Sequence, residues 1–460
     1  MRDVPTDLLH RLRLHQQEHV LLGWESLTAS QRQALVDQLS GIDLEEIAAL
    51  YAKRDQGQAL PSNDRIAPAL MIPHHGISNN ARDAGATALA RGEVAVLLVA
   101  GGQGSRLGFD KPKGMFPIGP ISNKSLFQIH AEKVFALQRR FGKPVPFLIM
   151  TSPATHADTV AYFDEQKYFG LPRSEVVFFQ QGTMPAVEIT TGRLLLEKPG
   201  VLFSSPNGHG GTITALSDSD LLKDLHRRGI RSIFYFQVDN PLVKIADPGF
   251  VGQHLAKRSE ASSKAIEKAY PKEKMGVLSL IDGRCGIIEY SDMPDDLLHA
   301  AHADGKLLHR AGSPAIHIFD VEFLMNITAD ASKLPYHIAR KKVACVDIAD
   351  PQKENALKFE RFIFDTLPLA ERWLVQEALR SEEFSPVKNK DGVDSPDTAR
   401  RDLINLAAQW LEQAGVTVPR DKNGNAIVPV EISPRFALDH HELMARIGLG
   451  RVVEGPIYLE

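Results

Sequence analysis

Short, wholly apolar runs alternate along the chain with longer segments in which apolar residues recur every three or four positions. The apolar runs predict β-strands over residues 94–100, 145–151, 176–180, 233–238, 275–281, 287–290 and 343–346. The amphipathic segments between them predict helices over residues 125–141, 156–165 and 218–228. Strands that alternate with helices are typical of an α/β sheet with helices on both faces.

The two ends of the chain differ from this middle part. Residues 1–90 predict a helical N-terminal extension, in which Ser30 starts a helix that ends before Gly41 and Asp43 starts the next one. Residues 415–460 contain short extended segments and the hairpin signal Asn423-Gly424, which predict a small β-rich region. We therefore expect three domains, over residues 1–90, 91–414 and 415–460.

A glycine-rich loop follows the first apolar strand. Gly101, Gly102 and Gly104 allow unusual backbone angles and leave backbone N–H groups open to a ligand. Arg106 and Lys113 add positive charge to the same loop. A strand followed by open backbone and clustered cations predicts a polyphosphate site, although a glycine turn that only connects two elements is the alternative.

Two common phosphate-binding motifs do not match this loop, whereas a third one does. The P-loop pattern is absent, and the dinucleotide fingerprint fails because Leu107 stands where its third glycine belongs. The run Gly-Gly-x-Gly-Ser-Arg-Leu-Gly, followed by Pro112-Lys113-Gly114, resembles the signature of nucleotide-sugar pyrophosphorylases.

Further candidate residues follow other predicted strands. Asp239 comes directly after the strand at 233–238 and is a suitable Mg²⁺ ligand, or else a turn-forming residue. Gln181 offers the amide donors and acceptor that a uracil edge needs. A second glycine-rich loop at 204–211 would let a flat ring or a sugar approach closely, or else is a mobile turn. Glu289 and Tyr290 could bind sugar hydroxyls and a pyranose face, or could be ordinary surface residues.

Composition narrows the possible partners. The chain has 460 residues with a net charge of -4, so no basic surface suggests a nucleic acid. No apolar run approaches the roughly 20 residues that cross a bilayer. The first residues lack the apolar core of a signal peptide, and only Cys285 and Cys345 are present. We expect a cytoplasmic protein with reduced thiols.

The order of these loops resembles the eukaryotic-type UDP-sugar pyrophosphorylase family (UDPGP type 1), nearest to its N-acetylglucosamine branch. Matching segments cover nearly the whole chain and include residues 181–186, 206–211, 239–244, 288–291, 355–360, 384–389 and 431–434. The resemblance implies a Rossmann-like, GT-A-like nucleotidyltransferase with a mixed sheet, whose catalytic domain is residues 91–414. It also implies that the protein transfers a uridylyl group from UTP to a sugar 1-phosphate, as a monomer or a homodimer.

The same resemblance implies a role for each candidate residue. Gly101, Gly102, Gly104 and Arg106 would hold the UTP phosphates beside Lys113, and Gln181 and Gly208 would recognise uracil. Asp239 would bind Mg²⁺ or Mn²⁺, and Lys388 would bind the sugar phosphate as a catalytic residue together with Arg106 and Lys113. The sugar itself would contact His209, Asn240, Glu289 and Tyr290.

Two positions depart from the pattern of the N-acetylglucosamine branch. His209 and Ser313 stand where that branch carries asparagines near the sugar, and Pro-x-Gly-His-Gly is closer to glucose-type enzymes. A glucose-1-phosphate or broad-specificity uridylyltransferase is therefore the alternative enzyme. A non-catalytic nucleotide-sugar binding protein and an oxidoreductase are the alternatives from other classes.

Overall fold

A computed structural model describes residues 3–55, 60–330, 334–346, 352–447 and 452–460. Contacts between residues divide the chain into two units, each assembled from three stretches of sequence. The larger unit comprises Pro61–Gln180, Ala215–Ala331 and Thr366–Glu460, and the smaller comprises Met1–Leu60, Gln181–Thr214 and Ser332–Asp365. The division at residues 90 and 414 remains a prediction.

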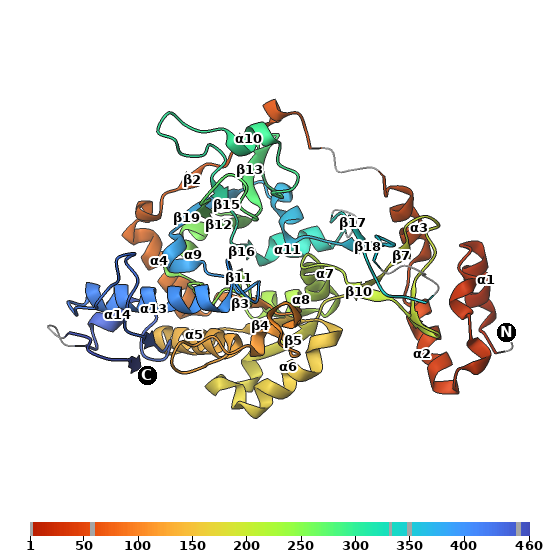
Figure 1. Cartoon of the computed structure of the whole chain (residues 1–460), viewed down its shortest axis with the longest axis horizontal. Helices are drawn as coiled ribbons and strands as arrows, with labels where there is room; N and C mark the ends of the chain where they lie inside the picture. The colour runs from red at the N-terminus through yellow and green to blue at the C-terminus, as the bar shows by residue number, and fades with distance from the viewer. Residues whose placement is uncertain (1–2, 56–59, 331–333, 347–351, 448–451) are drawn as a thin grey trace. The chain divides into compact units, whose positions relative to one another are not determined.

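Four parallel strands form one end of the sheet of the larger unit (Figure 1). Their order is β5 (Val176–Gln180), β4 (Phe147–Thr151), β3 (Val94–Val99) and β11 (Ser232–Gln237). These are the first four predicted runs, with ends shifted by two residues at most. Residues on both faces of β3 are buried, including Val96 and Leu97. Burial on both faces explains why β3 and β4 are apolar runs rather than alternating ones.

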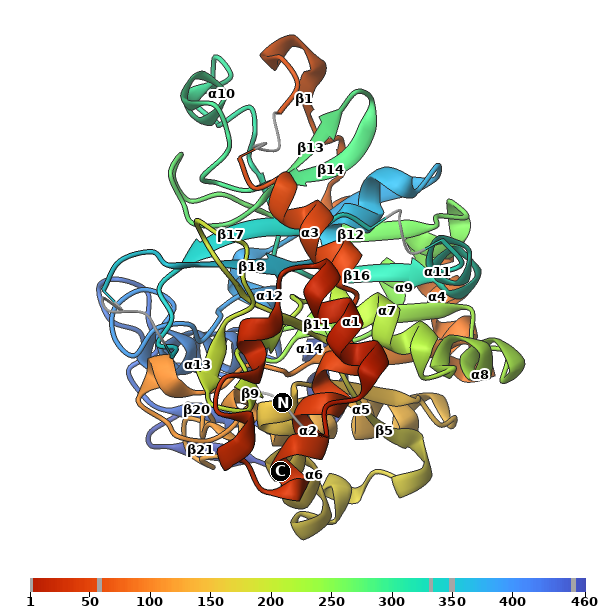
Figure 2. The same ribbon diagram turned by 90° about the vertical axis from the view of Figure 1, so that its right-hand side faces the viewer.

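The sheet continues beyond β11 with mostly antiparallel pairings. β11 pairs with β16 (His317–Asp320), which pairs with β12 (Ala261–Glu267). The remaining strands are β15 (Ala311–Gly312), β13 (Val277–Ile281), β14 (Arg284–Ile288), β1 (Ile66–Pro68), β19 (Trp373–Ala378) and β2 (Met71–Ile72), of which β19 is parallel to both β12 and β2. Figure 2 shows β13 and β14 next to β1, as their pairing requires. Among the described residues the sheet has 12 strands, and its mixed character confirms the predicted fold class.

Helices cover the parallel strands. α5 (Leu126–Phe141) begins after the capping side chain of Ser125 and ends at Gly142, as predicted. α6 (Pro153–Glu165) packs on β4 and β5 (Figure 1). The predicted helix at 218–228 is present as α8 (Leu221–Arg227), which begins later than predicted because Asp220 adopts a left-handed conformation with φ 56°. An additional helix, α7 (Gly211–Asp218), precedes it.

One apolar core joins the helices to the sheet. It combines alternate residues of β3, β4 and β11 with residues of α5, α4 (Asn79–Arg91) and α9 (Pro248–Ala256). The other helices of the larger unit are α10 (Asp295–His299), α11 (Val321–Thr328), α12 (Arg380–Glu383), α13 (Pro396–Gln413) and α14 (His440–Met444). No helix in the described part of the chain has both the length and the apolar character to cross a lipid bilayer.

The last part of the chain belongs to the larger unit. β20 (Val430–Ile432) and β21 (Ile457–Leu459) form a parallel pair, and α13 packs on β20 and α14. The predicted turn at Asn423-Gly424 is present, with φ 81° at Gly424 and a hydrogen bond from Asp421 N to Asn425 O of 2.8 Å. It closes a short bridged loop between Arg420 and Ala426 rather than a hairpin of two named strands.

The smaller unit combines three helices with short strands. Its helices are α1 (Thr6–Leu14), α2 (Ala29–Ser40) and α3 (Leu44–Ala52). Its strands are β6 (Thr183–Pro185), β7 (Val187–Glu188), β8 (Leu196–Lys198), β9 (Val201–Leu202), β10 (Ser204–Pro206), β17 (His337–Lys341) and β18 (Ala356–Glu360). Asp43 caps α3 as predicted, whereas Thr28 rather than Ser30 caps α2.

One strand prediction in this unit is wrong. Residues 343–346 do not form a strand. The backbone of Val343 instead exchanges two hydrogen bonds with the side-chain amide of Asn355, at 2.9 and 2.8 Å. A side chain therefore satisfies the polar backbone groups that a strand neighbour would otherwise satisfy.

Candidate active site

The glycine-rich loop begins where β3 ends and folds back on itself. Gly104 N donates to Lys111 O at 2.9 Å, and Lys113 N donates to Gly102 O at 3.0 Å. A side chain at Gly104 would lie 2.7 Å from Phe109 O, so only glycine fits there. Gly102 by contrast has open space around it, which leaves its backbone accessible.

Lys113 and Asp239 come together at the carboxyl edge of the parallel sheet. β3 and β11 are in parallel register, with Val99 opposite Gln237, so the loops that follow them emerge side by side. Lys113 Nζ lies 3.7 Å from Asp239 Oδ2, and the two side chains are only 17% and 12% exposed. A strand-end carboxylate beside a lysine, next to open backbone, can bind a charged phosphate group together with a cation.

The segment that carries Lys388 is tied to the loop of Asp239. Val387 N donates to Asp239 O at 2.9 Å. The amide of Asn240 donates to Glu383 O at 2.7 Å and accepts from Ser385 N at 3.1 Å. Asn240 therefore uses most of its hydrogen-bonding capacity within the protein, which orients the segment leading to Lys388.

The other cations near these loops are exposed. Arg106 and Lys111 lie on the surface of the glycine-rich loop. Lys388 Nζ is 4.0 Å from Asp394 Oδ2, and its side chain is partly exposed. Such weakly held cations can turn toward an anionic substrate at little cost.

Two of the predicted sugar residues of the larger unit, Glu289 and Tyr290, lie after β14. Glu289 is half-buried and directly follows the strand, while Tyr290 is exposed. Ser313 follows β15 and donates its backbone N–H to Gly276 O at 2.9 Å. Ser313 Oγ accepts a hydrogen bond from Ala315 N at 3.3 Å, so this hydroxyl helps to close its own turn.

The second glycine-rich loop lies in the smaller unit. Asn207 N donates to Gly182 O at 3.0 Å, next to the buried Gln181. Gly208 has φ 84°, and a side chain there would lie 2.4 Å from Arg361 O. The sequence predicted that the glycines of this loop make room for a ligand. At Gly208, the space that a side chain would fill is occupied by the backbone of Arg361 instead.

His209 is built into an aromatic cluster of the smaller unit. Its ring stacks on Phe362 at 5.3 Å, and its Nδ1 accepts a hydrogen bond from Ile363 N at 3.2 Å. Burial, with a smaller contribution from the charge of His337, lowers the pKa of His209 to about 4. The imidazole is therefore neutral at pH 7, and with Nδ1 accepting, Nε2 carries the proton.

Residues that brace these loops were missed at the level of sequence. Arg361 N donates to Asn207 O at 2.7 Å, and the Arg361 guanidinium lies over the Tyr336 ring at 4.0 Å. Lys264 forms a buried ion pair with Glu383, with an Nζ–Oε1 distance of 2.6 Å. In the sequence, the signal for this pair was a single lysine among the mostly small, uncharged residues of the β12 segment.

Open backbone, a lysine and a carboxylate at the carboxyl edge of a mixed α/β sheet are features of a nucleotidyltransferase. Residues 49–436 match the family described as UTP–glucose-1-phosphate uridylyltransferase (UDPGP), and the chain belongs to that family. The family predicted from the sequence is therefore confirmed.

Relatives with curated names cover most of the chain. It is 37% identical over 449 residues to the UDP-N-acetylglucosamine pyrophosphorylase of Saccharomyces cerevisiae, covering 92% of this chain and 93% of the relative. It is 37% identical over 430 residues to the UDP-N-acetylhexosamine pyrophosphorylase-like protein 1 of Xenopus tropicalis, covering 88% and 84%. The structure of the Trypanosoma brucei uridine diphosphate N-acetylglucosamine pyrophosphorylase in complex with inhibitor has a TM-score of 0.84 and 26% identity, over 100% of this chain and 99% of that chain.

The class of enzyme follows from this membership. The chain is a uridylyltransferase whose substrates are UTP and a sugar 1-phosphate and whose product is a UDP-sugar. The predicted fold and reaction are confirmed at this level. The roles of individual residues remain predictions.

Proposed function

We propose that the sugar substrate is N-acetylglucosamine 1-phosphate and that residues 101–113, Asp239 and Lys388 carry out the transfer. The names of the relatives support the choice of sugar. The observation that supports the catalytic residues is the approach of Lys113 to Asp239, 3.7 Å apart beside the open backbone of Gly102.

The proposed reaction is an in-line displacement at the α-phosphorus of UTP. An oxygen of the sugar phosphate forms the new P–O bond, and the bond from the α-phosphorus to the bridging oxygen breaks as pyrophosphate leaves. A phosphomonoester has a second pKa of about 6, so the nucleophile is already largely ionised at pH 7 and needs no general base. The protein then has to position two anions and offset their repulsion.

Each predicted residue has a place in this proposal. Gly101 and Gly102 offer backbone N–H groups to the phosphates of UTP, with Arg106 and Lys113 as cations, while Gly104, whose N–H donates to Lys111 O, shapes the loop. Lys388 binds the phosphate of the sugar. Gln181 and Gly208 hold uracil, whereas Glu289, Tyr290 and His209 contact the sugar. Asn240 lies close to the sugar and also orients the Lys388 segment, because its amide holds Glu383 and Ser385.

A divalent metal ion fits the proposed site through Asp239. The described residues contain no cluster of three or more acidic, histidine or cysteine side chains that would form a metal cage. Mg²⁺ commonly binds through one or two carboxylates together with substrate phosphates, so a single carboxylate suits it. When bound, Mg²⁺ or Mn²⁺ would neutralise charge on the phosphates, and Lys113 beside Asp239 would add to that effect.

Glucose 1-phosphate is the second candidate substrate, and His209 favours it. The neutral ring presents an Nε2–H donor, which suits a sugar hydroxyl or an acetamido carbonyl. The imidazole is also wider than the asparagine expected in the N-acetylglucosamine branch, which leaves less room for an acetamido group. Replacing His209 by Asn therefore tests which sugar the site prefers.

The deciding experiment measures pyrophosphate release from UTP and Mg²⁺ with four sugar 1-phosphates: N-acetylglucosamine, N-acetylgalactosamine, glucose and galactose. We expect the highest kcat/KM with N-acetylglucosamine 1-phosphate, and an increase in that preference for His209→Asn. A higher kcat/KM with glucose 1-phosphate would refute the proposed sugar. UTP binding without turnover of any of the four would refute the proposed catalytic residues.

Two further properties belong to the proposal. We propose a cytoplasmic location, as expected for a chain with only two cysteines. We leave a monomer and a homodimer as the two candidate assemblies, which sedimentation at micromolar concentration would distinguish.

A further inference from the structure

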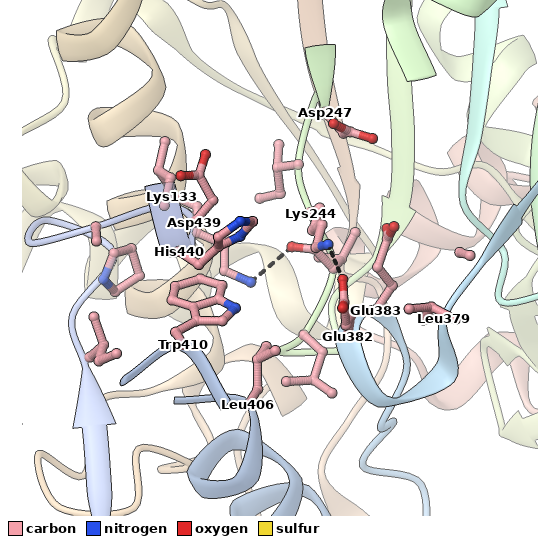
Figure 3. Close-up of a pocket in the computed structure, with 18 of the residues that line it drawn as sticks. Lys133, Lys244, Asp247, Leu379, Glu382, Glu383, Leu406, Trp410, Asp439 and His440 are labelled. Carbon is pink, nitrogen blue, oxygen red and sulfur yellow. Dashed lines mark hydrogen bonds and ion pairs between the residues drawn. The ribbon is translucent and has the colours of Figure 1, made fainter. Parts of the chain in front are cut away.

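A cavity of about 550 Å³ lies within the larger unit, beneath the segment that follows Asp239 and Asn240. Its lining includes residues 241–245, side chains of α5 and α13, and residues 437–441 (Figure 3). None of the predicted site residues lines it. Its volume falls in the range of small-molecule binding sites, roughly 300–1,000 Å³.

One wall of the cavity is apolar and aromatic. Trp410, Leu406 and Leu403 of α13 line it, and the Trp410 ring is only partly buried by the protein. Figure 3 shows the Trp410 ring and the Leu406 side chain facing the space around Lys244. A flat apolar group would gain burial against this wall.

The acidic groups around the cavity already have partners. Glu382 pairs with Lys244, Glu383 with Lys264, and Asp439 with Arg140. Glu431 accepts hydrogen bonds from the backbone N–H groups of Ile121 and Ser122. The cavity therefore offers little to attract a cationic ligand.

Lys133 differs from Lys124 and Lys244, the other two lysines that line the cavity, in the partners of its ammonium group. Its Nζ donates to Pro241 O at 2.6 Å and to Val243 O at 2.8 Å, which uses two of its three protons. No carboxylate among the described residues lies within ion-pair distance of it, whereas Lys124 pairs with Glu132 and Glu460 and Lys244 pairs with Glu382. Burial lowers the pKa of Lys133 to about 7, although the charge of Glu383 acts in the opposite direction.

We propose that this cavity is a regulatory site for a small aromatic anion, whose negative group binds Lys133 and whose flat body packs against Trp410 and Leu406. The anion would supply the third acceptor for the Lys133 ammonium group. It would also provide the charge that the surrounding carboxylates, each already paired, do not supply. A neutral aromatic compound would gain the apolar contact alone.

The regulatory part rests on the proposed function, because it requires Asp239 and Lys388 to be catalytic. Lys133 holds the carbonyls of Pro241 and Val243, which directly follow Asp239 and Asn240. The same segment is tied through the Asn240 amide to Glu383 and Ser385, which lead to Lys388. An anion bound to Lys133 as its third acceptor would change how the ammonium group holds these two carbonyls, and would thereby shift the residues that hold both substrates' phosphates.

The first test measures binding of the fluorescent aromatic anion 8-anilinonaphthalene-1-sulfonate, with UTP and Mg²⁺ at saturation so that the nucleotide site is filled. We expect Lys133→Met to weaken binding about tenfold or more, the size of a hydrogen bond to a charged group. Lys143→Met, at an exposed lysine just after α5, is the matched control and should leave binding unchanged.

N-phenyl-1-naphthylamine, the same body without the sulfonate, should bind more weakly and be insensitive to Lys133→Met. Equal loss of both probes, or no loss of the anionic one, would overturn the proposed anion site. Leu403→Trp, which fills the cavity, gives a second readout if Lys133→Met does not fold: it should abolish binding of both probes. Unchanged binding to that variant would also overturn the site.

The second test follows pyrophosphate release with and without the anionic probe. We expect the probe to change kcat of the wild-type enzyme at least twofold and to leave Leu403→Trp unaffected. An equal response of both enzymes, or none in the wild type despite binding, would overturn the regulatory role. If no sugar 1-phosphate supports turnover, the proposed function fails, while the binding measurements still decide whether the anion site exists.

Discussion

Replacement of Lys264 by Met tests the buried charge pair beneath the proposed catalytic segment. Lys264 lies in β12, and its side chain is 0% exposed. Its Nζ lies 2.6 and 2.5 Å from the two carboxylate oxygens of Glu383 and 3.5 Å from Asp247. Methionine keeps most of the aliphatic stem, so the substitution removes mainly the charge.

The loss of stability in Lys264→Met depends on the Glu383 carboxylate that the substitution leaves without its partner. Without Lys264, the Glu383 carboxylate is 7% exposed and has no ion-pair partner among the described residues. Leaving one partner of a buried pair alone costs about 3–5 kcal/mol. We therefore expect the free energy of unfolding to fall by about 3–5 kcal/mol.

Urea unfolding followed by circular dichroism would measure this change. The control is Lys223→Met, which removes an ion pair with Asp220 whose side chains are 70% and 73% exposed, and which should cost less than about 1 kcal/mol. The double variant Lys264→Met/Glu383→Leu should recover most of the loss, since an apolar pair replaces the charges. A double variant as unstable as the single one, or a single variant no worse than the control, would refute the reasoning.

Three further predictions concern the two units. Lys113→Met should lower kcat about a hundredfold or more, whereas the exposed neighbour Lys111→Met should change it only a few-fold, as steady-state kinetics would reveal. Gly208→Ala should destabilise the protein more than Gly305→Ala in urea, because both glycines have positive φ but only Gly208 would clash, with Arg361 O; equal losses would contradict this. Burial lowers the pKa of His254 to about 3, so the unfolded chain takes up a proton below pH 6.5 that the native protein does not. Stability relative to His254→Asn should therefore fall by about 1.2 kcal/mol between pH 6 and pH 5, and a constant difference would exclude this linkage.

The sequence alone determined the parallel end of the sheet and the family. The strands at Val94–Val99 and Phe147–Thr151 were readable because both faces are buried, which forces a continuous apolar run. The glycine-rich loop was readable because its backbone conformation depends on local residue types. The sequence did not reveal the short strand β15, and it wrongly predicted a strand at residues 343–346. Pairing partners distant in sequence decide whether so few residues form a strand.

Only the tertiary structure decided which side chains meet. The parallel register of β3 and β11 brings Lys113 to 3.7 Å from Asp239, and no local pattern encodes a contact across 126 positions of sequence. The tertiary structure also revealed that the lack of a side chain at Gly208 makes room for the Arg361 backbone, and that the Asn240 amide orients the segment of Lys388. Local propensity fixes backbone shape, whereas burial, charge pairing and close approach depend on segments that only folding brings into contact.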